Sequence, residues 1–112
     1  MNQATEILSL DSYNSIDSID FGETVTFIKF GTDWCDPCKK LHEVLLGVPM
    51  SIIYNVDVQN DEFEQFLSEN RIYNIPTTII KYKKYKTQFA GVRTLEELKK
   101  IVDVLKENVN KN

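Results

Sequence analysis

Segments rich in β-branched and aromatic residues alternate along the chain with segments of helical periodicity, and this alternation constrains the fold more than any other feature. The first kind predicts strands and the second kind predicts helices. We expect strands at 5–10, 24–30, 51–58, 77–82 and 86–90, and helices at 11–19, 34–46, 61–70 and 95–109. The order βαβαβαββα predicts an α/β fold in a single domain, residues 1–112, with a central mixed sheet and helices on both of its faces.

Polar residues at the ends of these segments carry the signals that start and stop helices. Gly47 follows the apolar stripe of the second helix and is expected to end it. Asp61 is expected to cap the third helix, with Glu64 three residues later. Thr94 and Glu97 form the same capping-box pattern before the fourth helix, whose apolar residues then follow at regular helical spacing.

The amino-acid composition limits where the protein is expected to be located and what it is expected to bind. Of the 112 residues, 42% are hydrophobic and 27% are charged, as in a soluble globular protein. The net charge of −4 argues against nonspecific binding to nucleic acid. The N-terminus does not resemble a secretory signal, and no apolar run reaches the roughly 20 residues that cross a bilayer. We therefore expect a cytoplasmic protein without membrane contact.

The second half of the chain carries four lysines between positions 81 and 86, where the last two strands are expected to meet. These residues predict a solvated hairpin with a Lys-Lys turn, whose charges discourage pairing with another sheet edge. The turn lacks the Asn-Gly or Gly-X sequence of a tight hairpin, so its boundary is loosely specified.

Two cysteines lie where the second strand is expected to turn into the second helix. A disulfide framework would need more cysteines, so this pair points to redox chemistry or metal binding. Free N–H groups and the helix dipole favour an anion at a helix N-terminus, so we expect a lowered pKa for Cys35. Cys38 is one turn further, within reach of a mixed disulfide formed at Cys35. Pro37 stiffens the segment where its missing N–H costs nothing, and Trp34 offers a flat apolar surface beside the thiols.

Two more distant segments have the character of a surface that receives another chain. Pro76, between Ile75 and Thr77, comes just before a strand and cannot continue a sheet ladder. It therefore marks an irregular backbone, for which a cis peptide bond is one option, and which can present free backbone groups to a peptide. Gly91, followed by Val92, allows the close approach of another chain.

These motifs together resemble the thioredoxin family. Residues 34–39, Trp-Cys-Asp-Pro-Cys-Lys, are similar to the family signature Trp-Cys-Gly-Pro-Cys-Lys. Residues 75–77, Ile-Pro-Thr, resemble its cis-proline loop, and residues 91–92 resemble the third element of its substrate groove. The order of strands and helices also matches the thioredoxin fold, so that the resemblance spans nearly the whole chain.

The resemblance implies a thiol–disulfide oxidoreductase that reduces protein disulfides. Cys35 would be the attacking nucleophile and Cys38 the resolving thiol, with no cofactor beyond this redox-active pair. The implied substrate groove contains Trp34, Ile75, Pro76, Thr77, Gly91 and Val92. The implied partners are disulfide-containing proteins, a thioredoxin-reductase-like flavoenzyme and, as one acceptor, ribonucleotide reductase, and the protein is expected to be a monomer.

The chain departs from the family at four positions. Asp36 replaces the signature glycine, and its carboxylate is expected to disfavour the Cys35 thiolate and make the protein more reducing. Lys29 stands where thioredoxins usually carry a buried aspartate, and Ile53 stands where they often carry the lysine that pairs with it. Glu43 replaces a common helix-kinking proline, so that a shorter, straight helix is expected.

Lys29 is the departure for which the sequence allows the largest number of chemical roles. In one interpretation its aliphatic stem packs while its ammonium reaches out to solvent. A neutral Lys29 would instead be able to act as a base, and a charged one would stabilise a Cys38 thiolate. All of these interpretations follow from the sequence alone.

The sequence also allows three alternatives to the thioredoxin interpretation: a zinc site, a glutaredoxin-like protein and a binding subunit. A zinc site would need His42 and Asp33 beside the cysteines, and the absence of a second Cys-x-x-Cys argues against it. His42 is then expected to be a surface helix residue. A glutaredoxin-like protein would use glutathione, but glutaredoxins usually carry Cys-Pro-Tyr-Cys. The remaining alternative is a binding subunit of a larger complex that uses the groove without thiol chemistry.

Overall fold

Five strands form one mixed sheet in the computed structural model, which describes residues 6–10, 16 and 22–110. The strands are β1 (Glu6–Ser9), β2 (Val25–Gly31), β3 (Ser51–Asp57), β4 (Thr77–Tyr82) and β5 (Tyr85–Ala90). They lie in the order β1-β3-β2-β4-β5. Strands β1, β3 and β2 are parallel, whereas β4 is antiparallel to β2 and β5 to β4. The predicted mixed sheet with a terminal hairpin and an N-terminal edge strand is confirmed.

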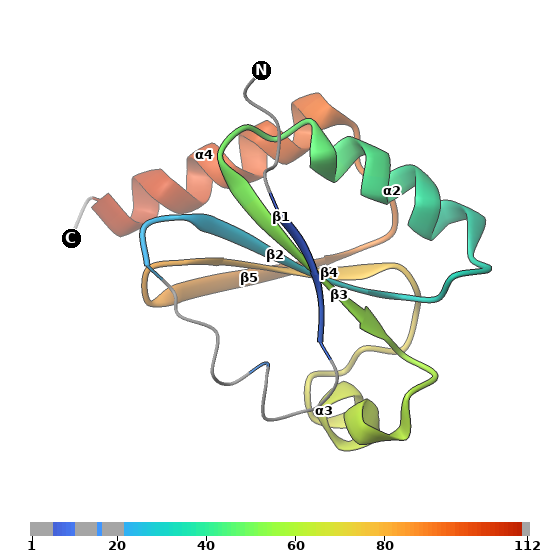
Figure 1. The fold of residues 1–112 in the computed structure, drawn as a ribbon. Coiled ribbons are helices and arrows are strands. Elements are labelled where there is room, and N and C mark those ends of the chain that lie inside the picture. Colours follow the sequence, from blue (N-terminus) through green and yellow to red (C-terminus); the bar gives the residue numbers. More distant parts are fainter. Residues whose placement is uncertain (1–5, 11–15, 17–21, 111–112) are drawn as a thin grey trace.

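Helices cover both faces of this sheet. They are α2 (Asp36–Leu46), α3 (Glu64–Glu69), which follows a short 3-10 turn (Asp61–Phe63), and α4 (Leu95–Asn110). Helices α2 and α4 lie over one face and α3 over the other (Figure 1). The helix predicted at 11–19 falls outside the described residues except for Ile16, which is fully buried. Within the described part of the chain, none of the helices is long and apolar enough to cross a membrane.

Strand β2 is buried on both faces, and its side chains alternate between two hydrophobic clusters. Phe27 packs with Leu41 of α2 and Leu98 of α4, whereas Ile28 and Phe30 pack on the opposite side of the sheet. This alternation follows from the period of two along a strand. Because β2 is packed into both clusters, its C-terminal end and the start of the following loop have a well-defined position.

Two helix starts differ from the sequence prediction and one is confirmed. The second helix begins at Asp36 rather than at residue 34, because Cys35 occupies the N-cap in an extended conformation. The third predicted helix begins as the 3-10 turn Asp61–Phe63, which is capped by Asn60 and not by Asp61: Asn60 Oδ1 accepts from the N–H of Glu62 at 3.0 Å, and α3 then starts at Glu64 without a side-chain cap of its own. The Thr94–Glu97 capping box is confirmed in both directions, with N···O distances of 2.9 and 3.1 Å.

The lysine-rich hairpin is only partly solvated, which corrects the sequence prediction. Strand β5 begins at Tyr85, and the turn consists of Lys83, with a φ of 54°, and Lys84. Lys81 is buried, as is every other residue of β4. Of the four lysines, Lys84 and Lys86 are exposed and Lys83 is partly exposed.

Candidate active site

The two cysteines lie where β2 gives way to α2, and they form a disulfide bond. Their Cα atoms are 5.2 Å apart, and the Cys35 side chain caps the helix by accepting the N–H of Cys38 at 3.2 Å. Pro37 is in the first turn of α2, as predicted, where no N–H is needed. Cys35 is 6% exposed and Cys38 1%. A sulfur at this position is stabilised as a thiolate by the helix N-terminus, and Cys35 is the more accessible of the two.

Gly31, the last residue of β2, lies directly behind Cys38. A Cβ atom added to Gly31 would come 2.7 Å from Cys38 Sγ, closer than packed atoms tolerate. The sequence analysis did not identify this glycine, because its neighbour is created by the turn and not by the local sequence. The disulfide therefore packs against the backbone at the end of β2, at a residue that has no side chain.

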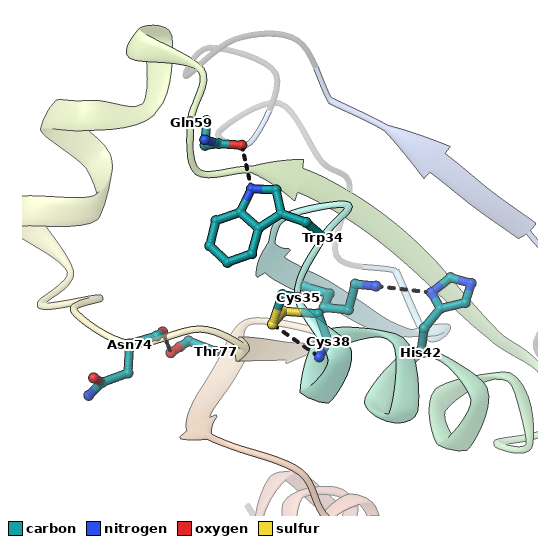
Figure 2. Close-up of a disulfide and its surroundings, with 8 residues drawn as sticks. Trp34, Cys35, Cys38, His42, Gln59, Asn74 and Thr77 are labelled. Atoms are coloured by element: carbon teal, nitrogen blue, oxygen red, sulfur yellow. Dashed lines mark hydrogen bonds between the residues drawn. A yellow bond between two sulfur atoms is a disulfide. The ribbon is translucent and has the colours of Figure 1, made fainter.

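Trp34 is exposed on the solvent side of the disulfide, at 67% of its surface. Its Nε1–H donates to Oε1 of Gln59 at 3.1 Å, from the loop that follows β3 (Figure 2). The N–H of Gln59 donates in turn to Oδ1 of Asp57 at 2.9 Å. Sequence reasoning missed Gln59, since nothing in its surroundings indicates a role. The indole ring is thus held in its exposed position beside the cysteines by a hydrogen bond to a residue 25 positions away in the sequence.

The predicted proline loop enters the sheet next to the end of β2. The Ile75–Pro76 bond is cis, which confirms that option from the sequence analysis. Thr77 pairs with Phe30 of β2, which brings the loop beside the turn that carries the cysteines. Figure 2 shows Thr77, with its hydroxyl on the carbonyl of Asn74, on the side of the disulfide away from His42.

Gly91 joins this loop through its backbone. Its N–H donates to the carbonyl of Pro76 at 2.8 Å, and its φ of 83° is a conformation that favours glycine. An added Cβ would meet nothing nearer than 3.7 Å, so conformation rather than space demands glycine at this position. Val92 follows and is 39% exposed. The sequence-predicted groove segments are therefore adjacent in the fold.

Beneath the disulfide, Lys29 does not extend its ammonium away from the protein. Its Nζ atom lies 3.2 Å from Nδ1 of His42 on α2, and both side chains are partly buried (Figure 2). The expectation that His42 is merely a surface residue is wrong, because it faces the sheet. Ile53 is fully buried in the cluster under α2 and α4, and α2 continues without a break through Glu43.

The surroundings of this pair act on both of its pKa values. Burial lowers the pKa of Lys29, although the carboxylate of Asp33 opposes that shift. Burial also lowers the pKa of His42, the positive charge of Lys29 lowers it further, and Glu43 opposes the shift. For each of the two side chains, the net shift of the pKa is towards the neutral form.

A disulfide at a helix N-terminus, next to an exposed indole and a cis-proline loop, defines a thiol–disulfide oxidoreductase. The thioredoxin family model matches residues 6–104, and the chain belongs to the thioredoxin family. It is a thioredoxin-type disulfide reductase whose redox-active group is the Cys35–Cys38 pair.

Individual relatives agree with this assignment. Mitochondrial thioredoxin-2 of Schizosaccharomyces pombe is 29% identical over 103 residues, which cover 88% of this chain and 75% of the relative. Thioredoxin domain-containing protein 2 of Rattus norvegicus is 27% identical over 90 residues, or 78% of this chain, and the match spans only 16% of that longer protein. The crystal structure of thioredoxin from Trypanosoma brucei brucei has the same fold, with a TM-score of 0.71, 22% identity, and coverage of 89% of this chain and 91% of that one.

Proposed function

We propose that this protein reduces disulfide bonds in protein substrates, with Cys35 as the attacking thiolate and Cys38 as the resolving thiol. The single observation that carries this assignment of roles is the position of the Cys35 sulfur. It caps α2, accepts the N–H of Cys38, and belongs to the more exposed of the two cysteines. A thiolate there has both electrostatic support and access to a substrate.

The reaction takes two exchange steps. The Cys35 thiolate attacks one sulfur of the substrate disulfide, and the other substrate sulfur leaves as a thiolate that takes a proton from water. Cys38 then loses its proton and attacks Cys35 Sγ, which breaks the mixed disulfide and releases the second substrate thiol. The substrate gains two electrons and two protons, and the protein ends with the Cys35–Cys38 disulfide.

Substrate would bind across the surface on the solvent side of the disulfide. Its proposed contacts are Trp34, Ile75, Pro76, Thr77, Gly91 and Val92. Trp34 and Val92 offer exposed apolar surface. The cis-proline loop interrupts regular strand pairing before β4 begins, and a substrate backbone would pair with it as an added strand.

As a member of the thioredoxin family the chain has disulfide substrates and a reductase. Among specific partners, we propose a flavoenzyme of the thioredoxin-reductase type as the electron source and ribonucleotide reductase as one acceptor. The proposed setting is the cytoplasm, and the proposed state is a monomer. Size-exclusion chromatography with light scattering tests the last of these directly.

Reduction of insulin disulfides with dithiothreitol tests the proposed roles. Cys35→Ser should abolish turnover, because no thiolate remains to attack. Cys38→Ser should also stop turnover, but it should accumulate a mixed disulfide between Cys35 and the substrate that mass spectrometry detects. A mixed disulfide on Cys38 in the Cys35→Ser variant, and none on Cys35, would reverse the assignment.

The same variants separate this proposal from the alternatives. If the chain is a binding subunit, Cys35→Ser leaves its biological function intact. If it is glutaredoxin-like, glutathione with glutathione reductase sustains insulin reduction better than a flavoenzyme of the thioredoxin-reductase type does. The family match favours the disulfide-reductase function over both.

A further inference from the structure

The side chains of Lys29 and His42 form a polar layer between the disulfide and the hydrophobic core under α2. Along β2, Phe27, Lys29 and Gly31 point to the same face of the sheet, because side chains of a strand alternate. Phe27 belongs to the core under α2, and Gly31 lies against Cys38 Sγ. Lys29 lies between them, so its side chain leaves the sheet one step below the resolving cysteine.

Helix α2 places a partner for Lys29 at the same level. His42 follows Cys38 by four residues, and residues four apart share one helix face. The 3.2 Å contact between Lys29 Nζ and His42 Nδ1 therefore closes the polar layer one helical turn from Cys38. The polar layer thus lies between β2 and α2, and the disulfide lies where these two elements join.

The direction of this contact depends on the protonation states of Lys29 and His42. An ammonium group has three donors and no acceptor, so a protonated Lys29 donates to an unprotonated Nδ1 of His42. A protonated His42 would instead present a second donor and break the contact. We take the first of these arrangements, in which Lys29 carries the positive charge and His42 accepts its hydrogen bond.

The other groups around the pair leave that charge only partly neutralised. Asp33 is the carboxylate that acts on Lys29, and Glu43 is the one that acts on His42. The neighbouring strands contribute Asn55 from β3 and Thr78 from β4, which are the register partners of Lys29 and carry no charge. No salt bridge to Lys29 forms among the residues that the structure describes.

A cleft connects this layer with the surface. Its volume is about 360 Å³, and Lys29, Asp33, Asn55 and Asp57 are among its lining residues. Thr32, at its wall, has a buried hydroxyl without a hydrogen-bond partner. A polar cleft of this volume admits water, which gives protons a way between the polar layer and solvent.

We propose that Lys29, positioned by His42, stabilises the thiolate of Cys38 and so speeds the resolving step of disulfide exchange. The inference deepens the proposed function and rests on its assignment of Cys38 as the resolving thiol. In that step Cys38 loses its proton to solvent, and its thiolate attacks Cys35 Sγ. The bond from Cys35 to the substrate sulfur breaks, its electron pair leaves with the substrate, and the substrate thiolate takes a proton from water. Lys29 and His42 touch no reacting atom, so they act as positioning and charge-supplying residues.

A two-phase reaction with 5,5′-dithiobis(2-nitrobenzoate) isolates this step. Attack by Cys35 on the reagent releases the first coloured thiolate, at a rate that depends on reagent concentration. Resolution by Cys38 releases the second, at a rate that does not. If Cys35 is not the nucleophile, the first phase is lost in Cys38→Ser, and the proposed function fails before the inference is reached.

Lys29→Met removes the charge, and we expect the second phase at pH 7 to slow about ten-fold, with its pH profile moved to higher pH. Lys29→Arg keeps the charge and should retain most of the rate. Lys40→Met is the matched control, because it removes an exposed lysine charge from α2, the helix that carries Cys38 and His42. An unchanged second-phase pH profile in Lys29→Met, or an equal effect in Lys40→Met, would overturn the inference.

His42 variants keep the inference testable if Lys29→Met does not fold. His42→Leu removes the acceptor for Lys29 and should slow the second phase about three-fold, since the charge is then free to move away. His42→Gln retains an acceptor oxygen and should restore the rate. Equal second phases in His42→Leu and His42→Gln would show that positioning of Lys29 has no effect on Cys38.

Discussion

The two sides of the Cys35–Cys38 disulfide differ in how closely they follow the family. The solvent side has the exposed Trp34, the cis Ile75–Pro76 bond and Gly91, all at positions that the thioredoxin motifs predict. The sheet side has Lys29, in contact with His42, at the position where the family usually has a buried aspartate. The proposed substrate surface therefore keeps the family pattern, whereas the groups proposed to tune the thiols depart from it.

The difference has a physical reason. A substrate backbone makes similar demands on every groove, so the side that binds it has few solutions. The pKa of a buried thiol can be adjusted by a negative, neutral or positive neighbour, provided that the neighbour is itself accommodated. In this protein His42 accommodates the positive neighbour with a hydrogen bond.

The largest expected effect concerns the sheet side, at Gly31. Gly31→Ala places a methyl group against Cys38 Sγ and should destabilise the oxidised protein by about 1–3 kcal/mol, as overpacking does. Urea unfolding of the oxidised form measures this. Gly22→Ala is the control, because a Cβ there meets nothing within 4 Å. Equal stabilities for the two variants would mean that the close approach at Gly31 is relaxed at no cost.

The matching change on the solvent side is Gly91→Ala. Alanine is strained at a φ of 83°, and the variant should lose about 1 kcal/mol of stability. Because the N–H of Gly91 holds the Pro76 carbonyl, the KM for insulin should also rise. A variant as stable as Gly22→Ala, with an unchanged KM, would contradict the role assigned to this glycine.

Asp36 tests the electrostatics of the solvent side. Asp36→Gly removes a carboxylate next to Cys35, so the pKa of the Cys35 thiol should fall in the variant. The exposed position of Asp36 limits the change to about two-fold more thiolate at neutral pH. Thiolate absorbance across a pH titration measures it, and identical titrations of parent and variant would remove Asp36 from the account of redox tuning.

The smallest expected effect is the acid dependence of the sheet side. The pKa of His42 lies below its ordinary value of 6.5 in the folded protein, chiefly because of burial. The unfolded chain therefore binds the proton first, and stability should fall as the pH drops through 6.5 towards the folded pKa. His42→Gln should lose this dependence while Thr94→Ala keeps it. Parallel stability profiles of His42→Gln and the parent between pH 7 and about 5 would exclude His42 as the source.

Much of the site was predictable because its signals are local. The Cys-x-x-Cys spacing, the proline before β4, the capping box at Thr94 and the alternation of strands and helices each depend on neighbours within a few residues. Local propensity and periodicity report such features directly. The family resemblance, which the match over residues 6–104 confirms, rests on the same local motifs.

The remaining features depend on contacts between distant segments. Gln59 holds Trp34 from 25 residues away, Gly31 is required because Cys38 folds back onto it, and Lys81 is buried together with every other residue of β4. For Lys29 the sequence left three interpretations open, since a lysine stem can pack in several directions. The sequence by itself determined the redox pair and its fold. Only the tertiary structure placed His42 within 3.2 Å of Lys29, because that contact exists once α2 packs on β2.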